Sequence, residues 1–438
     1  MKPQSKLVLT LLFLFMLMVQ GIRAEGDSIL TDTTLIESLK PVRHWGFSLG
    51  GGPGWVIAMD KYVKMWLKDN FAYAVNAEVQ YHTYPSDNDD FAADFNYPTI
   101  SLGLRYGNYA STTMHKSASS HWGMAEPVDY HSRLGNTLTT YMTFSRPFFR
   151  TRHWEADYSM GTGVGYSRHP YNKHFNIDNE IIGSRWLIYF SAGVHATYKF
   201  SPHWGVKAGA EFAHLSNGAI DRPNKGSNTV MPTLSFLYYP NDFYETDNRT
   251  PHVSKPFKPF WYLNAMAGIG GKSLLEEWDR TQYKLPETDP AYRKGSFAVY
   301  AAYSLSADIM CRYTRRWASG AGVDLFYGEY ASRLRDIDEE FGHSGKMHNP
   351  LSLALAAKHE VFFHNTSLKV ALGLYVNRHM GYFAKDNEQI FYERVGLHHA
   401  FPKLNGLQVG FFVKAHLGKA DFTELTLTYP IRLTKQRD

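Results

Sequence analysis

The sequence contains a single cysteine, Cys311, among 438 residues, which excludes a disulfide framework and any cysteine-based zinc site. Charged residues make up 20% of the chain, below the roughly 25% that is typical of soluble globular proteins. The net charge is only +5 and no dense patch of Lys and Arg is present, which argues against nucleic-acid binding. Aromatic residues are abundant, at 15%. This composition predicts a surface that does not face water everywhere.

Long apolar runs are also missing, since no stretch after the first residues approaches the 18 apolar residues of a membrane-spanning helix. The apolar run at residues 7–19 is 13 residues long, follows Lys2 and Lys6, and precedes a small-residue site at residues 21–24. We interpret residues 1–24 as a cleaved secretory signal, with a membrane-anchored N-terminus as the alternative. An exported, aromatic-rich chain without spanning helices is either a periplasmic β protein or an outer-membrane barrel.

The pattern of apolar residues favours the barrel. Apolar and polar residues alternate with period two, as in strands with one apolar face, over residues 71–82, 100–108, 154–166, 186–200 and 296–313. Strands of soluble sandwiches are usually about 5–6 residues long, whereas a membrane-crossing strand needs about 9–11 and carries aromatic residues at both ends. The sequence therefore predicts an all-β, antiparallel transmembrane β-barrel located in the outer membrane.

The connections between these runs alternate in length. Short connections are expected at residues 150–152, 201–203, 315–316, 364–366 and 402–405, and long polar ones at 110–133, 168–184, 272–294, 331–348 and 378–388. Outer-membrane barrels have short periplasmic turns and long external loops. We therefore expect the long set to face the outside of the cell.

An internal repeat divides the chain. Residues 154–219 resemble residues 368–420 in strand spacing, and each half offers about eight strands on either side of Pro240–Pro259. We expect a first barrel half at residues 25–240, carrying the chemistry, and a second, degenerate half at 241–438. One barrel of about 14–16 strands is the first expectation, because one closed barrel per chain is the commoner outcome. Two tandem eight-stranded barrels are the alternative.

The residues that carry chemistry lie in one hairpin, at residues 211–228. His214 and Ser216 are two apart on a predicted strand, so their side chains project from the same face. A serine hydroxyl is a weak nucleophile that needs an adjacent base, and the base needs a third group to hold its tautomer. Because the chain turns and returns, we expect Asn228 beside the pair on the neighbouring strand.

Parity predicts which way the pair points. Val206, Ala208, Ala210 and Phe212 share the face of His214 and Ser216, so the pair lies on the lipid-facing wall. A polar pair is costly there unless it has a purpose. The turn that follows belongs to the external set, which places the pair near the outer leaflet, where lipopolysaccharide is.

These residues carry a family resemblance. The stretch His214-Leu-Ser216-Asn217, followed by Pro223-Asn224-Lys-Gly226, resembles the lipid A 3-O-deacylase family of outer-membrane enzymes, mainly over residues 154–239. The resemblance implies eight-stranded barrels with a Ser–His–acid triad on the lipid-facing surface. It further implies that Ser216 is the nucleophile and His214 the general base. Asn217 and Gly218 then belong to the oxyanion and substrate site, and Asn224 shapes the loop.

The sequence departs from the family pattern at the position of the triad's acidic residue. Asn228 stands where the family pattern has Glu. An Asn can orient a His by accepting from its ring N–H, but it stabilises an imidazolium charge less well than a carboxylate. Glu211 has the wrong parity for this role, and Asp221 lies in the turn.

The second copy of the hairpin lacks the nucleophile. His416 aligns with His214, but Gly418 replaces Ser216 and Lys419 replaces Asn217. Parity directs His416 into the lumen, so we expect no second active site. The remaining histidines are scattered without the spacing of metal ligands. The sequence therefore predicts neither a metal site nor a cofactor.

Two functions follow from these features. The first is a serine esterase that removes an acyl chain from lipid A, the lipopolysaccharide anchor, with a phospholipid ester as the alternative substrate. The second is a non-catalytic pore or structural barrel that retains a degenerate hydrolase hairpin.

Overall fold

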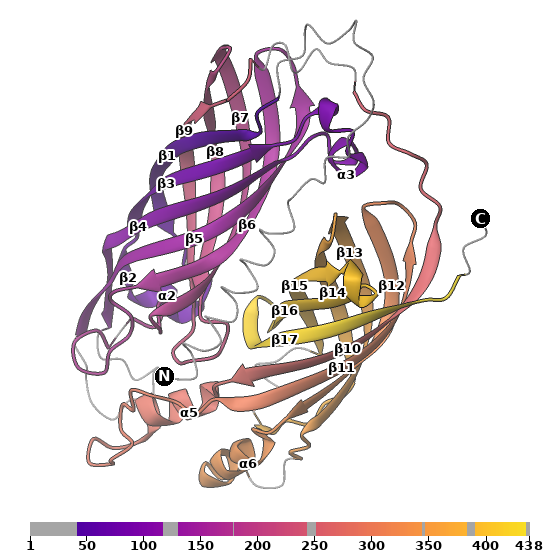
Figure 1. Ribbon diagram of the computed structural model, residues 1–438. Helices are drawn as coiled ribbons and strands as arrows, with labels where there is room; N and C mark the ends of the chain where they lie inside the picture. The colour runs from indigo at the N-terminus through magenta and orange to yellow at the C-terminus, as the bar shows by residue number, and fades with distance from the viewer. Residues whose placement is uncertain are drawn as a thin grey trace, which may run out of the picture.

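The computed structural model describes residues 42–116, 130–177, 179–242, 251–343, 347–382 and 390–434. In these ranges the chain forms two antiparallel β-barrels that follow one another in sequence, the first indigo to magenta and the second salmon to yellow in Figure 1. The expected signal segment, residues 1–24, lies outside the described residues. No helix among the described residues has the length and apolar character needed to cross a membrane.

The first barrel closes with eight strands in the described ranges, and a short strand, β2, pairs with β4. Its strands are β1 (Trp45–Val56), β2 (Leu67–Asp69), β3 (Phe71–His82), β4 (Thr99–Lys116), β5 (Tyr130–Arg150), β6 (Trp154–Ser167), β7 (Trp186–Ser201), β8 (Trp204–Ser216) and β9 (Ser227–Tyr238). Short helices lie between them: α2 (Lys61–Trp66), η1 (Pro85–Asp87) and α3 (Asp90–Asp94).

The second barrel also closes with eight strands in the described ranges. They are β10 (Phe260–Lys272), β11 (Tyr300–Arg312), β12 (Trp317–Gly328), β13 (Leu351–Phe363), β14 (Thr366–Asn377), β15 (Phe391–Phe401), β16 (Leu407–His416) and β17 (Lys419–Arg432). The helices are α5 (Leu275–Asp279), η3 (Arg280–Lys284), α6 (Ala331–Glu340) and η4 (Pro402–Leu404).

The expectation of one barrel with 14–16 strands is wrong, and the alternative of two tandem eight-stranded barrels is confirmed. The first ladder closes where β9 returns to β1, with Phe47 opposite Tyr238. The second closes where β17 returns to β10, with Tyr262 opposite Arg432. Each ladder therefore satisfies the backbone groups at its own edges, and within the described ranges no strand joins the two barrels into one sheet.

Alternation along the strands sorts apolar side chains outward and polar ones inward. In the first barrel Leu104 is 54% exposed on the outer wall, whereas its neighbour Arg105 is 2% exposed in the lumen. In the second barrel Leu305 is 56% exposed, whereas Ser304 and Ser306 on either side are buried. An apolar outer wall around a polar interior is the arrangement of membrane-spanning barrels.

Each barrel has one end with long connections and one with short turns. The long connections include residues 168–185, 273–299 and 329–350, and we name this the long-loop end. The opposite, short-turn end carries the tight connections after Arg150, Ser201, Arg312 and Phe363, together with one longer connection, residues 83–98, that contains α3. The connection expected at 110–133 is shorter than predicted, because β4 and β5 extend to Lys116 and Tyr130.

Charged side chains fill both lumens. In the first barrel Arg105 pairs with Glu211 across the interior, and Asp157 contacts both Lys207 and His195. In the second barrel Asp324 lies 2.6 Å from Lys358 and 3.5 Å from Arg394, and Arg394 also pairs with Glu424. Eight strands leave an interior just wide enough for side chains, and these networks occupy it.

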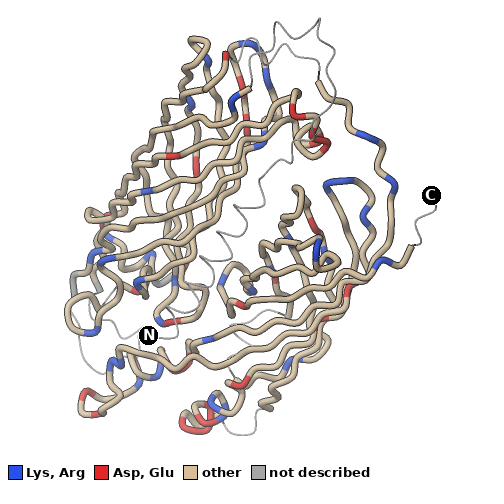
Figure 2. The backbone as a smooth tube through the Cα atoms, viewed as in Figure 1, with Lys and Arg blue, Asp and Glu red and all other residues tan. Residues whose placement is uncertain are grey.

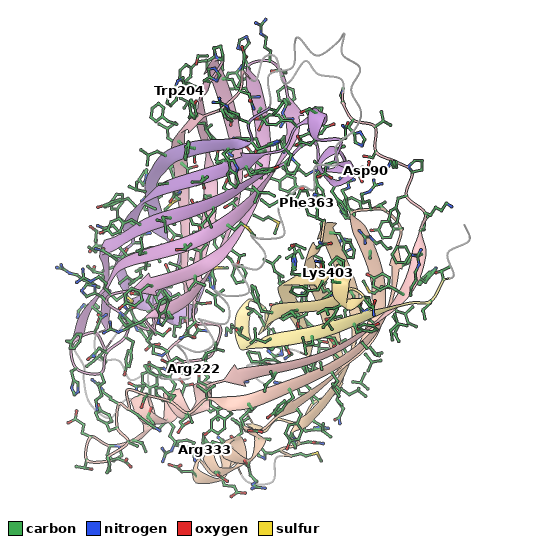
Figure 3. The ribbon with its side chains drawn as sticks, viewed as in Figure 1. Asp90, Trp204, Arg222, Arg333, Phe363 and Lys403 are labelled. Carbon is green, nitrogen blue, oxygen red and sulfur yellow. The ribbon has the colours of Figure 1, made fainter. Side chains whose placement is uncertain are left out.

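The barrels contact each other at the short-turn end. The acidic helix α3 of the first barrel faces the basic β11–β12 turn of the second (Figure 2), where Arg315 lies 2.8 Å from Asp90 and 3.3 Å from Asp94. Phe363 at the end of β13 packs against Phe95 and Phe144, with ring centroids 5.8 and 5.2 Å apart. Asp90 and Phe363 mark this junction in Figure 3. A second junction, at the long-loop end, involves the candidate site.

Candidate active site

The hairpin of β8 and β9 brings the predicted residues together. His214 pairs directly with Asn228, and Leu215 with Ser227, at the long-loop end of the first barrel. The intervening turn, residues 217–226, connects these two strands. Register therefore places Asn228 beside His214, as the return of the chain predicts.

The ring of His214 is oriented by Asn228. Its Nδ1 lies 2.8 Å from the Asn228 side-chain Oδ1. Because the amide oxygen can only accept, Nδ1 donates and Nε2 carries the lone pair. The structure thus gives His214 the tautomer in which Nε2 can act as a base.

The pair faces outward from the barrel. Phe212, two residues before His214, is 37% exposed on the outer wall, while Leu215 is 2% exposed in the lumen. Glu211 is also on the inner side, where it pairs with Arg105. Glu211 is therefore committed to the lumen and does not reach the His214 ring.

Ser216 lies on the same outward face but makes no direct contact with its expected base. No hydrogen bond joins its hydroxyl to the His214 ring among the described residues. Residues two apart on a strand are separated by about 6.6 Å, so parallel side chains stand apart. Geometry in the absence of substrate is often longer than in the reacting complex. The expected adjacency is present, while the hydrogen bond is not.

The turn after Ser216 is organised by its own side chains. Asn224 Oδ1 accepts from the Asn217 backbone N–H at 2.9 Å, and Asn217 Nδ2 donates to the Pro223 carbonyl at 3.3 Å. Gly218 and Ala219 follow with φ values of 62° and 66°. The Asn217 backbone N–H is therefore engaged, whereas the Gly218 N–H has no hydrogen-bond partner among the described residues. Of the two, Gly218 is the available backbone oxyanion donor.

The second half of the turn packs against the His214 ring and the neighbouring loops. A Cβ at Gly226, whose φ is 74°, would lie 2.7 Å from His214 Cε1. Lys225 extends between Asp60 at 3.2 Å and Glu180 at 3.3 Å, with its ammonium 5.0 Å from the Trp66 ring centroid. Burial alone would lower the pKa of Lys225, but Glu180 and Asp60 raise it above its ordinary value. Through these ion pairs and the contact with the Trp66 ring, Lys225 connects the turn to α2 and to the β6–β7 loop.

The other candidates lie away from the His214 ring. Asp221 accepts the backbone N–H of Arg222 at 2.9 Å, within its own turn. His416, the counterpart of His214, is 3% exposed inside the second barrel, where its Nε2 lies 3.0 Å from the Tyr375 hydroxyl. The described residues contain no group of three or more His, Cys, Asp or Glu placed to hold a metal.

The second barrel covers the turn, a feature that the sequence analysis missed. Thr423 Oγ1 donates to the Gly218 carbonyl at 2.9 Å, and Arg222 donates to the Ser273 carbonyl at 2.8 Å through Nη2. Arg222 lies at this junction in Figure 3. These contacts join residues 51 to 205 positions apart, so no local pattern signals them.

One further Ser–His pair was also missed. Ser319 on β12 and His359 on β13 are direct partners, and the Ser319 hydroxyl lies 2.9 Å from His359 Nδ1. Both face outward, near the short-turn end of the second barrel. Among the described residues no carboxylate or amide contacts the His359 ring. This pair lacks the orienting group that His214 has.

Closed antiparallel barrels with apolar outer walls and polar interiors define the class of outer-membrane-type barrel proteins. Residues 73–236 match the family model described as Lipid A 3-O-deacylase (PagL). Residues 261–433 match the model described as Acyloxyacyl hydrolase, C-terminal domain. Each barrel therefore corresponds to one matched domain, and both family models describe hydrolases that act on lipid A or acyloxyacyl groups.

Solved structures that resemble the chain share little sequence identity with it. Neisserial surface protein A is 7% identical, with a TM-score of 0.26, and the match covers 46% of this chain and 99% of that one. OccK11 of Pseudomonas aeruginosa is 10% identical, with a TM-score of 0.17 and coverages of 89% and 96%. The search of curated proteins found no match.

Proposed function

We propose that the protein is an outer-membrane serine esterase that removes an ester-linked acyl chain from lipid A. Ser216 is the nucleophile, His214 the general base and Asn228 the group that orients it. The observation that carries the proposal is the 2.8 Å contact between His214 Nδ1 and Asn228 Oδ1, on the outward wall beside Ser216. The match of residues 73–236 to the Lipid A 3-O-deacylase model supports the substrate class.

The reaction proceeds in two steps. The Ser216 hydroxyl attacks the ester carbonyl while His214 Nε2 takes its proton, and the tetrahedral intermediate then expels the sugar alkoxide, which His214 protonates. This leaves the acyl chain on Ser216 and a free sugar hydroxyl. Water, activated by the same His214, next attacks the acyl-enzyme, releasing the fatty acid and restoring Ser216.

The negative oxygen of the intermediate needs hydrogen-bond donors. The Gly218 N–H is suited to this role because it has no partner among the described residues. The Asn217 side-chain amide, with Nδ2 on the Pro223 carbonyl, retains a second N–H that can also donate. Donors of this kind each contribute roughly 10²–10³-fold to kcat in other hydrolases.

Orientation in the membrane supports a lipopolysaccharide substrate. Barrels of this class place short turns in the periplasm and long loops outside the cell. The site at the long-loop end would then lie at the level of the outer leaflet. The filled lumens, crossed by pairs such as Arg105–Glu211 and Arg394–Asp324, argue against the alternative of an open pore.

Mass spectrometry of lipid A from cells that express the protein tests the proposal. We expect the unchanged protein to remove one acyl chain and Ser216→Ala to leave lipid A intact. Ser319→Ala is the matched control, because it removes an outward serine hydroxyl beside a histidine in the second barrel. Identical lipid A in cells with the unchanged protein and with Ser216→Ala, each shown to be folded by heat-modifiable gel mobility, would refute the esterase.

A further inference from the structure

Thr423 is a buried polar residue on the outer wall of the second barrel, which is otherwise apolar and exposed along β17. Its outward neighbours along β17 are apolar and exposed to the surroundings, with Leu427 at 54% and Tyr429 at 42%. Thr423 is polar and 0% exposed, because the turn after Ser216 lies directly on it. Its hydroxyl donates to the Gly218 carbonyl at 2.9 Å. A buried hydroxyl of the second barrel, that of Thr423, thus forms a hydrogen bond with Gly218, the candidate oxyanion donor.

Ser273 forms a second, reciprocal contact from the residue that follows β10. Its backbone N–H and its hydroxyl both donate to the Ala219 carbonyl, at 2.8 and 2.9 Å. In return, Arg222 donates to the Ser273 carbonyl through Nε at 3.0 Å and Nη2 at 2.8 Å. Ser273 and Ala219 are both 0% exposed. Shielding from water strengthens these hydrogen bonds and makes the loss of one partner costly.

The contact between the turn and the second barrel leaves no room for a side chain at position 218. A Cβ at position 218 would collide with Thr423 Oγ1 and lie 2.8 Å from Ile188 Cδ1. The close approach of the two barrels therefore requires a residue without a side chain. The carbonyls of Gly218 and Ala219 are both held by the second barrel, while the Gly218 N–H is left without a partner among the described residues.

The second barrel has a separate anchor at the other end. Arg315 pairs with Asp90 and Asp94 of α3, and His364 lies 2.8 Å from Asp89. Burial alone would raise the pKa of Asp89, but its hydrogen bond with His364 lowers it below its ordinary value. Two junctions at opposite ends fix the position of Thr423 and Ser273 relative to the turn.

We propose that the second barrel is the positioning element of the catalytic turn, with Thr423 and Ser273 holding the peptide planes after Gly218 so that its N–H points to the oxyanion. The proposal rests on the proposed function and adds a role for the second domain. Thr423 and Ser273 are positioning residues, because they act through the turn and not on the substrate.

Kinetics of the purified full chain with lipid A in mixed micelles test the proposal. Thr423→Val keeps the shape and removes the hydroxyl, so we expect kcat to fall roughly tenfold or more with KM unchanged. Thr423→Ser restores the donor and should recover most of kcat. Thr428→Val is the matched control, since Thr428 is 1% exposed on the same strand and its hydroxyl has no partner among the described residues.

Ser273→Ala is the second variant, used if heat-modifiable gel mobility shows that Thr423→Val does not fold. It removes one of two donors to the Ala219 carbonyl, and we expect a smaller fall in kcat, again at constant KM. Unchanged kcat in the folded variants, or an equal fall in Thr428→Val, would overturn the role of the second barrel. Activity of the unchanged protein that Ser216→Ala abolishes is established first, so these outcomes would leave the esterase intact.

Discussion

The Nδ1 atom of His214 lies 2.8 Å from Oδ1 of Asn228, on directly paired residues of β8 and β9. In the proposed site an amide thus holds the ring at the position where a Ser–His–acid triad has a carboxylate. The amide fixes the imidazole tautomer, which needs only an acceptor, but it carries no charge that would stabilise the imidazolium of the proposed acylation step.

Asn228→Leu should lose activity by about 100-fold or more, because the His214 ring would lose the acceptor that sets its tautomer. Lipid A deacylation measured by mass spectrometry gives the readout, and heat-modifiable mobility shows that the barrels fold. His416→Ala is the control, since this lumenal ring contacts Tyr375 and lies outside the site. Full activity in Asn228→Leu would move the orienting role elsewhere, with Asp221 the next residue to test.

Asn228→Glu should raise kcat, because a carboxylate orients the ring and also stabilises the imidazolium. The rate of fatty-acid release by the purified variant is the measurement. The gain should appear in kcat and leave KM unchanged, since the residue touches His214 and not the substrate. A fall in kcat with normal folding would show that the longer side chain displaces the ring.

Gly226→Ala should impair catalysis more than stability. The added Cβ would lie 2.7 Å from His214 Cε1, and a φ of 74° adds backbone strain of about 1–2 kcal/mol. Gly418→Ala is the matched control, with a φ of 75° and nothing within 4 Å of its Cβ, so it carries the strain without the collision. Urea unfolding and deacylation rates should separate the two variants. Equal activity in both would mean that the ring tolerates the methyl group.

Arg105→Ala should destabilise the first barrel by about 3–5 kcal/mol, because it leaves Glu211 as a buried charge without its partner. Arg105 and Glu211 side chains are 2% and 14% exposed. The control is Arg280→Ala, which breaks a more exposed pair with Glu340 (17% and 38%) and should cost about 1 kcal/mol or less. Urea unfolding in detergent micelles measures both. Similar losses would indicate that the lumen is well hydrated.

Asp279→Asn should stabilise the protein above neutral pH. Burial, together with Glu276 and Glu180, raises the pKa of Asp279 from 3.8 to about 7. The folded state then binds the proton more tightly than the unfolded state, so its stability falls as pH rises from about 4 through 7. At 1.36 kcal/mol per pKa unit the effect is at most about 4 kcal/mol. The variant should exceed the unchanged protein in free energy of unfolding at pH 8 and match it near pH 4, and the reverse order would contradict the sign.

Much of the fold was readable from the period-two pattern. The predicted run at residues 71–82 coincides with β3, and the runs beginning at Trp154 and Trp186 coincide with β6 and β7 to within one residue. The outward face of His214 was also predicted, because one wall of each strand must be apolar. Asn228 was placed beside His214 because a single turn, residues 217–226, connects their strands, and the register follows from local geometry.

The sequence by itself determined the strands, their two faces and the hairpin that carries the candidate site, since each depends on residues close together along the chain. Only the tertiary structure decided where the barrels close, because the pairing of Phe47 with Tyr238 or of Tyr262 with Arg432 is a choice between strand edges that alternation does not distinguish. The same holds for Thr423 on Gly218. That contact exists only because two closed barrels dock, and docking depends on shape and hydrogen bonding between distant segments.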